Sequence, residues 1–309
     1  MSQPPLASIL INNHNYGKFV GDAIESTLSQ TYPHCEVIVV DDGSTDESRE
    51  IIRQHQSKIT PIFQDNQGQA VAINKSFLKS QGKYIFLLDS DDLFMPSKIE
   101  KIVEIFEVNS DIGWCFHPML MVDENGEEIP NLKETYTGNS GIYDLTTSMR
   151  SGKLAGLLPI QGVATSALCF RRSFLKELLP MPESMSFEGL RVTSDNYLKY
   201  ASFGLAKGYI LLELMTHQRV HGSNAYTMRQ GIPELRLDMD IMTAYWLRRR
   251  FPALSTFSHN LFAFALSQGR NISEIPPRVN RLIRQYRESL TWREKLFITF
   301  KRIYYSLKS

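Results

Sequence analysis

The chain has 309 residues, of which 42% are hydrophobic and 22% are charged, so it can form one large domain with its own core, or a domain with an appendage. Lys and Arg total 34 against 33 for Asp and Glu, and the net charge of +1 gives no general argument for nucleic-acid binding. Three widely spaced cysteines indicate neither a disulfide framework nor a metal site. The N-terminus lacks a secretory signal and no apolar run is long enough to span a membrane, so we expect a cytoplasmic protein.

Apolar and amphipathic segments alternate over the first hundred residues. The apolar, β-branched segments predict strands at 7–12, 35–42, 60–64 and 84–89, with amphipathic helices between them. This alternation predicts βαβ units, and therefore an α/β fold with a mostly parallel sheet flanked by helices. Because βαβ connections are right-handed, the carboxyl ends of the strands share one edge, which is where open α/β sheets bind ligands.

The pattern is less regular in the rest of the chain. The elements that we expect there are a helix at 97–109, a strand at 112–122, a long loop at 131–162, a strand at 163–172, a helix at 194–204, a strand at 209–224 and two or three helices after Pro233. We divide the chain into an α/β unit at 1–228, with its acceptor part at about 111–228, and a helical C-terminal extension at 229–309.

Polar residues follow each of the first four predicted strands. They are Asn12, Asn13 and His14, then Asp41 and Asp42, then Asn66 and Gln67, and finally Asp89, Asp91 and Asp92. Three carboxylates within four positions repel one another unless a cation lies among them, and Mn²⁺ or Mg²⁺ commonly binds through one or two carboxylates plus the phosphates of a substrate. The alternative is that these aspartates only begin a turn and a helix, which explains one of them better than three.

The pair Asp41 and Asp42 leaves a similar choice open. A carboxylate there can accept hydrogen bonds from a uracil N3–H or a ribose hydroxyl, or the segment can simply turn from strand to helix at Gly43. The chain has no GxGxxG after its first strand and no GxxxxGK[ST] motif, so dinucleotide binding and P-loop chemistry lose support.

Two blocks carry a family resemblance, the segment from SILINNHNYGKF to VVDDGSTDES at 8–48 and the segment from NQGQAVAIN to LLDSDDLFMP at 66–96. They resemble the family 2 glycosyltransferases, densely over about the first 110 residues and in patches to about residue 225. The resemblance implies a Rossmann-like GT-A fold and an inverting, metal-dependent transfer of a sugar from a nucleotide-sugar donor, UDP-sugar in particular. It specifies neither the sugar nor the acceptor.

The resemblance also implies roles for individual residues. Asp42 matches the aspartate that binds uracil, Asn12 and His14 line the same base pocket, and Gln69 falls at a nucleotide-binding position. The segment Asp89-Ser90-Asp91 resembles the DXD motif, in which Asp91 would hold the Mn²⁺ or Mg²⁺ and Asp89 or Ser90 would face the ribose.

Two later blocks complete the expected site. The segment SDNYLKYASFG matches the block that holds the family's general base, which makes Asp195 the base, although Ser194 stands where glutamate is common. In RVHGSN, His221 matches a histidine that approaches the metal or the diphosphate. Each residue also has a structural alternative, because Asp195 can cap its helix and His221 can stabilise a turn with Gly222.

The last part of the chain is basic. Residues 278–309 hold nine Lys and Arg against two Glu, a net charge of +7, so the other 277 residues carry 1 − 7 = −6. Helical stripes are formed by Leu282, Ile283, Tyr286 and Leu290, and by Leu296, Phe297, Phe300, Ile303 and Tyr304. The two helices can pack on the catalytic domain or a second subunit, or they can bind anionic lipid at the inner face of a membrane.

We therefore predict a glycosyltransferase of glycan or polysaccharide synthesis, which transfers a sugar to a hydroxyl of a sugar or lipid-linked glycan acceptor. One rival is a metal-dependent nucleotidyltransferase or phosphohydrolase with the same carboxylates. The other is a non-catalytic protein that binds nucleotide sugars, which the serine at position 194 makes credible.

Overall fold

The structure is a computed structural model, and it describes residues 3–132, 136, 138–153, 160, 163–182, 194–222, 224, 232–268 and 275–308. The strands are β1 (Ala7–Asn13), β2 (Cys35–Asp42), β3 (Thr60–Gln64), β4 (Tyr84–Asp89), β5 (Leu93–Phe94), β6 (Trp114–Phe116), β7 (Leu120–Val122), β8 (Gly141–Tyr143), β9 (Leu168–Arg171), β10 (Gly208–Ile210) and β11 (Thr216–Arg219). The helices are α1 (Gly17–Leu28), α2 (Ser48–Gln54), α3 (Gln69–Lys79), α4 (Lys98–Val108), α5 (Thr146–Arg150), α6 (Arg172–Leu178), α7 (Ser194–Leu205), α8 (Ile232–Arg250), α9 (Ser255–Ser267), α10 (Pro277–Glu288) and α11 (Trp292–Ser306).

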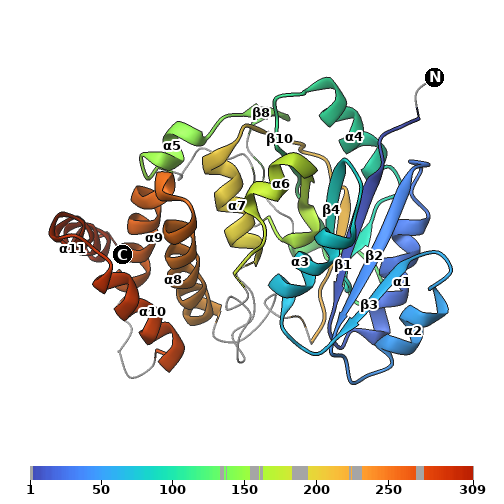
Figure 1. Ribbon diagram of the computed structural model, residues 1–309, viewed down its shortest axis with the longest axis horizontal. Coiled ribbons are helices and arrows are strands. Elements are labelled where there is room, and N and C mark those ends of the chain that lie inside the picture. Colours follow the sequence, from blue (N-terminus) through green and yellow to red (C-terminus); the bar gives the residue numbers. More distant parts are fainter. Residues whose placement is uncertain are drawn as a thin grey trace.

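One large sheet organises the α/β part (Figure 1). Its eight strands lie in the order β3-β2-β1-β4-β9-β6-β10-β8. The first four pair in parallel, whereas β9 runs antiparallel to both β4 and β6. A second sheet has the order β5-β11-β7. The predicted α/β architecture is confirmed, and the pair β6 and β10 in the same sheet is also parallel.

The strand register brings polar side chains together at the carboxyl edge. Asn12 on β1 lies opposite Asp89 on β4, and Asn13 lies opposite Asp41 on β2. Partners in a register point to the same face of a sheet, so each pair is within hydrogen-bonding reach.

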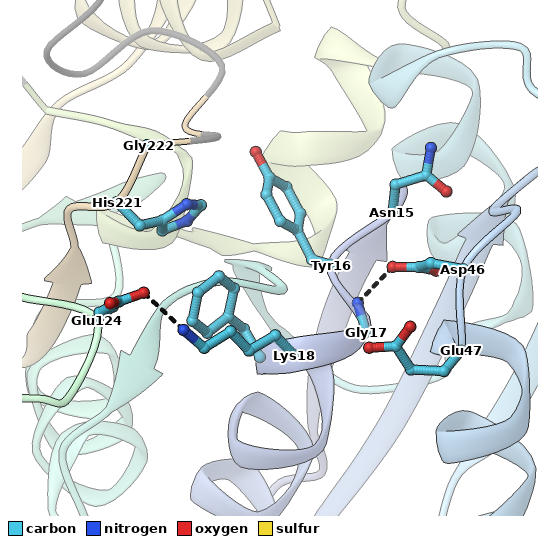
Figure 2. Close-up of a pocket in the computed structure, with 10 residues that line it drawn as sticks. Asn15, Tyr16, Gly17, Lys18, Asp46, Glu47, Glu124, His221 and Gly222 are labelled. Carbon is cyan, nitrogen blue, oxygen red and sulfur yellow. Dashed lines mark hydrogen bonds and ion pairs between the residues drawn. The ribbon is translucent and has the colours of Figure 1, made fainter.

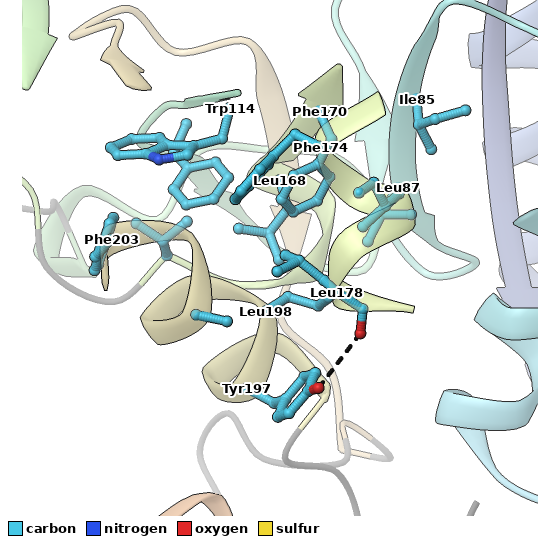
Figure 3. Packing of buried hydrophobic residues seen from close by; sticks show 14 of the residues in the cluster. Ile85, Leu87, Trp114, Leu168, Phe170, Phe174, Leu178, Tyr197, Leu198 and Phe203 are labelled. Carbon is cyan, nitrogen blue, oxygen red and sulfur yellow. Dashed lines mark hydrogen bonds between the residues drawn. The ribbon is translucent and has the colours of Figure 1, made fainter. Parts of the chain in front are cut away.

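Two hydrophobic layers hold this edge in place. Side chains alternate across β4, with Ile85 and Leu87 on one face and Phe86 and Leu88 on the other. Figure 3 shows the first layer, where strands β4 and β9 pack against helices α6 and α7. A fully buried side chain of this size contributes roughly 1.5–3 kcal/mol to stability. These two layers therefore support the polar carboxyl edge of the parallel strands, which we call the rim.

Three predictions for the later chain are corrected. The expected strand at 112–122 is two strands in different sheets, because Pro118 between β6 and β7 has no N–H to donate to a ladder. The expected strand at 209–224 likewise divides into β10 and β11. The expected loop at 131–162 contains β8 and α5 in its described residues.

Helices α8 to α11 pack beside the α/β part (Figure 1). The described chain has four α-helices after Pro233, where two or three were expected. Contacts tie them to the α/β part, as Arg250 donates to the Leu179 carbonyl at 2.7 Å and Asn260 donates to the Gly152 carbonyl at 2.9 Å. The predicted domain boundary at residue 228 lies outside the described residues and stays a prediction.

Candidate active site

Asp42 is at the end of β2, and its carboxylate organises the start of α3. Its Oδ1 accepts hydrogen bonds from the side chain of Gln64 at 2.6 Å and the backbone N–H of Gln67 at 2.7 Å. Its Oδ2 accepts from the backbone N–H of Gly68 at 2.6 Å. A carboxylate has about four acceptor positions, so about one is left for a ligand.

Gly43 makes this tight turn possible. Its φ is +77°, and a Cβ there would lie 2.5 Å from the backbone nitrogen of Asn66. The left-handed conformation and the close approach both require glycine. The two loops after β2 and β3 are therefore held against each other.

His14 lies beside Asp42 at the end of β1. Its Nδ1 is 2.7 Å from the Asp42 carbonyl oxygen, which can only accept, so Nδ1 carries the proton in this contact. The amide nitrogen of Asn66 is 3.1 Å from the other ring nitrogen, Nε2. The predicted base-binding residues His14 and Asp42 are thus adjacent.

Asp89 is the acceptor for two other residues that the sequence assigns to the nucleotide site. Its Oδ1 accepts from Nδ2 of Asn12 at 2.8 Å and from Nε2 of Gln69 at 2.7 Å. The side-chain oxygens of Asn12 and Gln69 are buried and have no hydrogen-bond partner among the described residues. Each amide thus donates to Asp89 and keeps an unpartnered, buried oxygen.

Asp91 meets the loop that follows β11. Its Oδ2 is 3.2 Å from Nε2 of His221 and accepts a hydrogen bond from Asn224 at 3.1 Å. The preceding Ser90 is fully buried, and its hydroxyl has no partner within the described part of the chain. The structure brings the predicted metal residues Asp91 and His221 together, and it adds Asn224, which the same RVHGSN block could have indicated.

Two basic side chains are buried near the acidic cluster, although the guanidinium of Arg219 pairs with Asp22 at 3.0 Å and not with a carboxylate of the cluster. Asp92 is 3% exposed, and it accepts a hydrogen bond from the backbone N–H of Arg219, whose side chain is also buried. Lys98 is completely buried and donates to the Ser166 carbonyl at 2.6 Å and the Thr216 hydroxyl at 2.9 Å. Neither cation is predictable from the sequence, because its neighbours in the chain do not distinguish it from a surface Lys or Arg.

The acidic groups influence one another's ionisation. Burial, followed by the neighbouring Asp91 carboxylate, raises the pKa of Asp89 to about 7, while hydrogen bonds from Asn12 and Gln69 oppose the rise. Burial raises the pKa of Asp92 well above its usual value, and the charges of Asp91 and Asp89 raise it further. Groups of this kind bind a cation more strongly when they are deprotonated together.

Asp195, the predicted general base, lies in the first turn of α7. Its charge also contributes to the raised pKa of Asp89, after burial and the Asp91 carboxylate. Burial raises the pKa of Asp195 itself, and the ammonium of Lys199 one helical turn later partly offsets the rise. A carboxylate with a raised pKa is a better proton acceptor at neutral pH.

A pocket of about 320 Å³ opens beside His221 (Figure 2). The ring of His221 contacts the ring of Tyr16 edge to face, with centroids 5.5 Å apart, and Lys18 forms a 2.6 Å ion pair with Glu124. The lining contains one lysine and three carboxylates, a net charge of 1 − 3 = −2, so it favours a cation or a neutral group over a free phosphate. Its residues are Asn15, Tyr16, Gly17, Lys18, Phe19, Asp46, Glu47, Glu124, His221 and Gly222.

The donor set at Asp91 fits a hard divalent cation that arrives with its substrate. Among the described residues no group of three or more His, Cys, Asp or Glu side chains forms a ready-made metal site. Asp91 and His221 supply one carboxylate and one imidazole, and Mn²⁺ or Mg²⁺ commonly completes such a set with water and substrate phosphates.

Comparison with known proteins decides the family. The model of the glycosyl transferase family 2 matches residues 8–179, more than half of the chain. The chain belongs to glycosyl transferase family 2. An uncharacterized glycosyltransferase of Nostoc sp. is 35% identical to this chain over 221 residues, which are 70% of this chain and 65% of the relative.

Solved structures show the same fold. The structure of Staphylococcus aureus TarS 1–349 in complex with UDP-GlcNAc matches this chain with a TM-score of 0.62 at 15% identity, covering 98% of this chain and 89% of the other. The mannosyltransferase of Pyrobaculum calidifontis in complex with GDP-Man and Mn²⁺ matches with a TM-score of 0.53 at 16% identity, covering 97% and 84%. The predicted GT-A fold is confirmed. In the described chain, no helix is both long enough and apolar enough to cross a bilayer.

Proposed function

We propose that this glycosyltransferase is metal-dependent and inverting, and that it transfers a sugar from a nucleotide-diphosphate donor, UDP-sugar in particular, to a hydroxyl of a glycan acceptor. The observation that carries the proposal is the contact of Asp91 with His221 beside Asp89, at one edge of the parallel sheet. Asp195, in the first turn of α7, is the general base that the family resemblance implies. The fold is similar to that of TarS, which was solved with UDP-GlcNAc, and this supports a UDP-sugar as the donor. It is also similar to that of a mannosyltransferase solved with GDP-Man, so a GDP-sugar is the alternative donor.

The nucleotide would bind along the carboxyl ends of β1, β2 and β4. Asp42 and His14 form the base end, where the remaining acceptor position of Asp42 suits a uracil N3–H. Asp89 and Ser90 form the ribose end, together with the unpartnered amide oxygens of Asn12 and Gln69. Ribose hydroxyls are donors that these oxygens would accept.

The diphosphate end of the donor requires positive charge, because the rim itself is acidic. Asp91 and His221 would hold Mn²⁺ or Mg²⁺, with Asn224 fixing the Asp91 carboxylate. When bound, such a cation supplies Lewis-acid stabilisation of the charge on the departing diphosphate.

The chemical step is a single displacement at the anomeric carbon. Asp195 takes the proton of the acceptor hydroxyl, whose oxygen bonds to the anomeric carbon as the bond to the diphosphate oxygen breaks. The nucleophile enters on the face opposite the leaving group, so the anomeric configuration inverts. Base and diphosphate site lie on different elements, α7 and the loop after β4.

The acceptor is a sugar or a lipid-linked glycan in glycan or polysaccharide synthesis. A basic segment at 278–309 would suit a lipid-linked acceptor through peripheral membrane contact.

The experiment is a panel of UDP-sugars and GDP-sugars with Mn²⁺, read first as thermal stability and then as transfer to a glycan acceptor. A donor that binds the folded state raises its stability by an amount that grows with the logarithm of the ratio of donor concentration to Kd. We expect stabilisation by one nucleotide class, and a product of inverted anomeric configuration by NMR. Absence of stabilisation by every nucleotide sugar would reject the proposal.

Asp195→Asn separates an enzyme from a nucleotide-sugar binder. An enzyme loses turnover but keeps metal-dependent donor binding, whereas a binder has no turnover to lose. Asp111→Asn is the matched control, since Asp111 is exposed and pairs only with Lys207 at 3.2 Å.

A further inference from the structure

Helix α11 has two apolar faces, and the protein covers only one of them. On the covered face Ile298 is 7% exposed, and Phe297 and Tyr305 pack against the same cluster as α8 to α10. Ser306 donates to the Ser267 carbonyl of α9, and Glu294 lies 3.1 Å from His259. This face therefore fixes α11 on α9.

The other face exposes large apolar side chains. Trp292 is 67% exposed, Phe300 is 70% and Leu307 is 83%. These residues and three more are spaced by 4, 4, 3, 1 and 3 positions, and at about 100° per residue they share about one third of the helix circumference. The stripe consists of Trp292, Leu296, Phe300, Ile303, Tyr304 and Leu307, and we call it the α11 stripe. Exposed apolar residues gathered in this way mark an interaction surface.

Basic residues flank the α11 stripe on both sides. At helical spacing Lys301 and Lys308 fall on one side of it, and Lys295 and Arg302 fall on the other. The helix has one carboxylate, Glu294, and that group is engaged by its own cap and by α9. Nothing acidic on α11 is free to oppose an anionic surface.

Helix α10 extends the basic surface. It buries its apolar residues, such as Leu282 and Tyr286, and leaves Arg281, Arg284 and Arg287 exposed. Figure 1 shows α10 and α11 at the outer edge of the molecule, on the side away from β2 and β3. The cations and the apolar stripe are thus both accessible.

From this arrangement we propose that the α11 stripe docks on an anionic lipid bilayer, with the aromatic and aliphatic side chains in the interface and the flanking cations on the headgroups. The 15 residues of α11 span about 22 Å, which is shorter than the hydrocarbon core of a bilayer. The helix therefore lies on the membrane and does not cross it.

The charges around the α11 stripe disfavour a second copy of the chain as the partner that covers it. A symmetric dimer through the stripe would place the flanking lysines and arginines of both copies against one another, and like charges at an interface are unfavourable. An anionic bilayer pairs with the same cations. This docking surface adds to the proposed transferase, and its test uses neither donor nor metal, so each proposal can fail without the other.

The test is co-sedimentation of the full chain with vesicles of phosphatidylcholine alone and of phosphatidylcholine mixed with phosphatidylglycerol. We expect binding to the anionic vesicles that weakens as salt is added. The double variant Phe300→Ser with Leu307→Ser should bind anionic vesicles at least about tenfold more weakly. Replacing any one of Lys295, Arg302 and Lys308 with a neutral residue should weaken binding about fivefold.

The matched control is Leu78→Ser with Val108→Ser, which removes two apolar side chains that are 82% and 76% exposed elsewhere on the surface. It should bind like the unchanged protein. The proposal is overturned by absence of binding to anionic vesicles, or by equal binding of the stripe variant. It is also overturned if sedimentation velocity shows a dimer that the stripe variant abolishes while neither protein binds vesicles.

Discussion

The rim of the parallel sheet and the surface of helices α10 and α11 both gather like charges, but they do so in opposite environments. At the rim, Asp91 and Asp92 are 8% and 3% exposed and lie among Lys98, Arg219 and His221. On α10 and α11 the cations stand in solvent. Buried charges shift one another's pKa and depend on specific partners, whereas exposed charges act together at longer range and are screened by salt.

The largest effect should come from Asp195, which we propose as the general base. Asp195→Asn should lower the transfer rate by about 10²- to 10⁴-fold, because the acceptor hydroxyl loses its proton acceptor. Nucleotide binding should change little. The measurement is steady-state transfer beside donor titration, and a variant that keeps its rate would exclude Asp195 as the base.

Replacement of a buried cation should cost stability where replacement of an exposed one does not. Lys98→Met leaves the Ser166 carbonyl without its 2.6 Å donor and removes a positive charge near Asp92, so we expect a loss of about 2–4 kcal/mol in the free energy of unfolding. Arg302→Met, in the exposed set, should stay within about 0.5 kcal/mol. Urea unfolding of both variants checks this, and equal losses would contradict the contrast.

The two faces of α11 should differ in the same way. Ile298→Ala opens a cavity in the cluster against α9 and should cost about 2 kcal/mol, whereas Phe300→Ala changes an exposed side chain and should cost less than about 0.5 kcal/mol. Thermal unfolding compares the two variants. A larger loss for Phe300→Ala would mean that the protein itself covers the α11 stripe.

Glu294 should give the smallest effect, and one that depends on pH. Burial alone would raise its pKa, but hydrogen bonds from Thr291, His259 and Arg248 outweigh it and lower the pKa from 4.5 to about 2. Because the folded-state pKa is the lower one, Glu294 stabilises the fold above about pH 4.5, and this stabilisation is lost as the pH falls towards 2. Glu294→Gln should cost about 1 kcal/mol at neutral pH and nothing near pH 2. Unfolding at several pH values measures the difference in stability between the variant and the unchanged protein. A difference that does not change with pH would refute the prediction.

The rim could be predicted from the sequence to a large extent. Parallel strands end at one edge, so Asn12 and Asp89 were expected there, and their register pairing makes the contact direct. Lys98 was not predictable, because the helix around it has the pattern of an ordinary surface helix. Lys98 donates to the Ser166 carbonyl just before β9, and β9 pairs antiparallel with β4. No local sequence pattern predicts this pairing.

The C-terminal helices were less predictable for the same reason. The sequence places Phe297 on one stripe with Leu296 and Phe300, but the packing of α11 on α9 buries part of that stripe and exposes the rest. Helical periodicity identifies an apolar surface, whereas the neighbouring helices determine which half of it remains exposed.

The most direct measurement for the central claim is calorimetric titration of the protein with UDP, with and without Mn²⁺, in parallel with Asp91→Asn. The account predicts binding that requires the metal and that the substitution abolishes. Absence of binding to UDP and GDP with the metal present, or equal binding by Asp91→Asn, would contradict it.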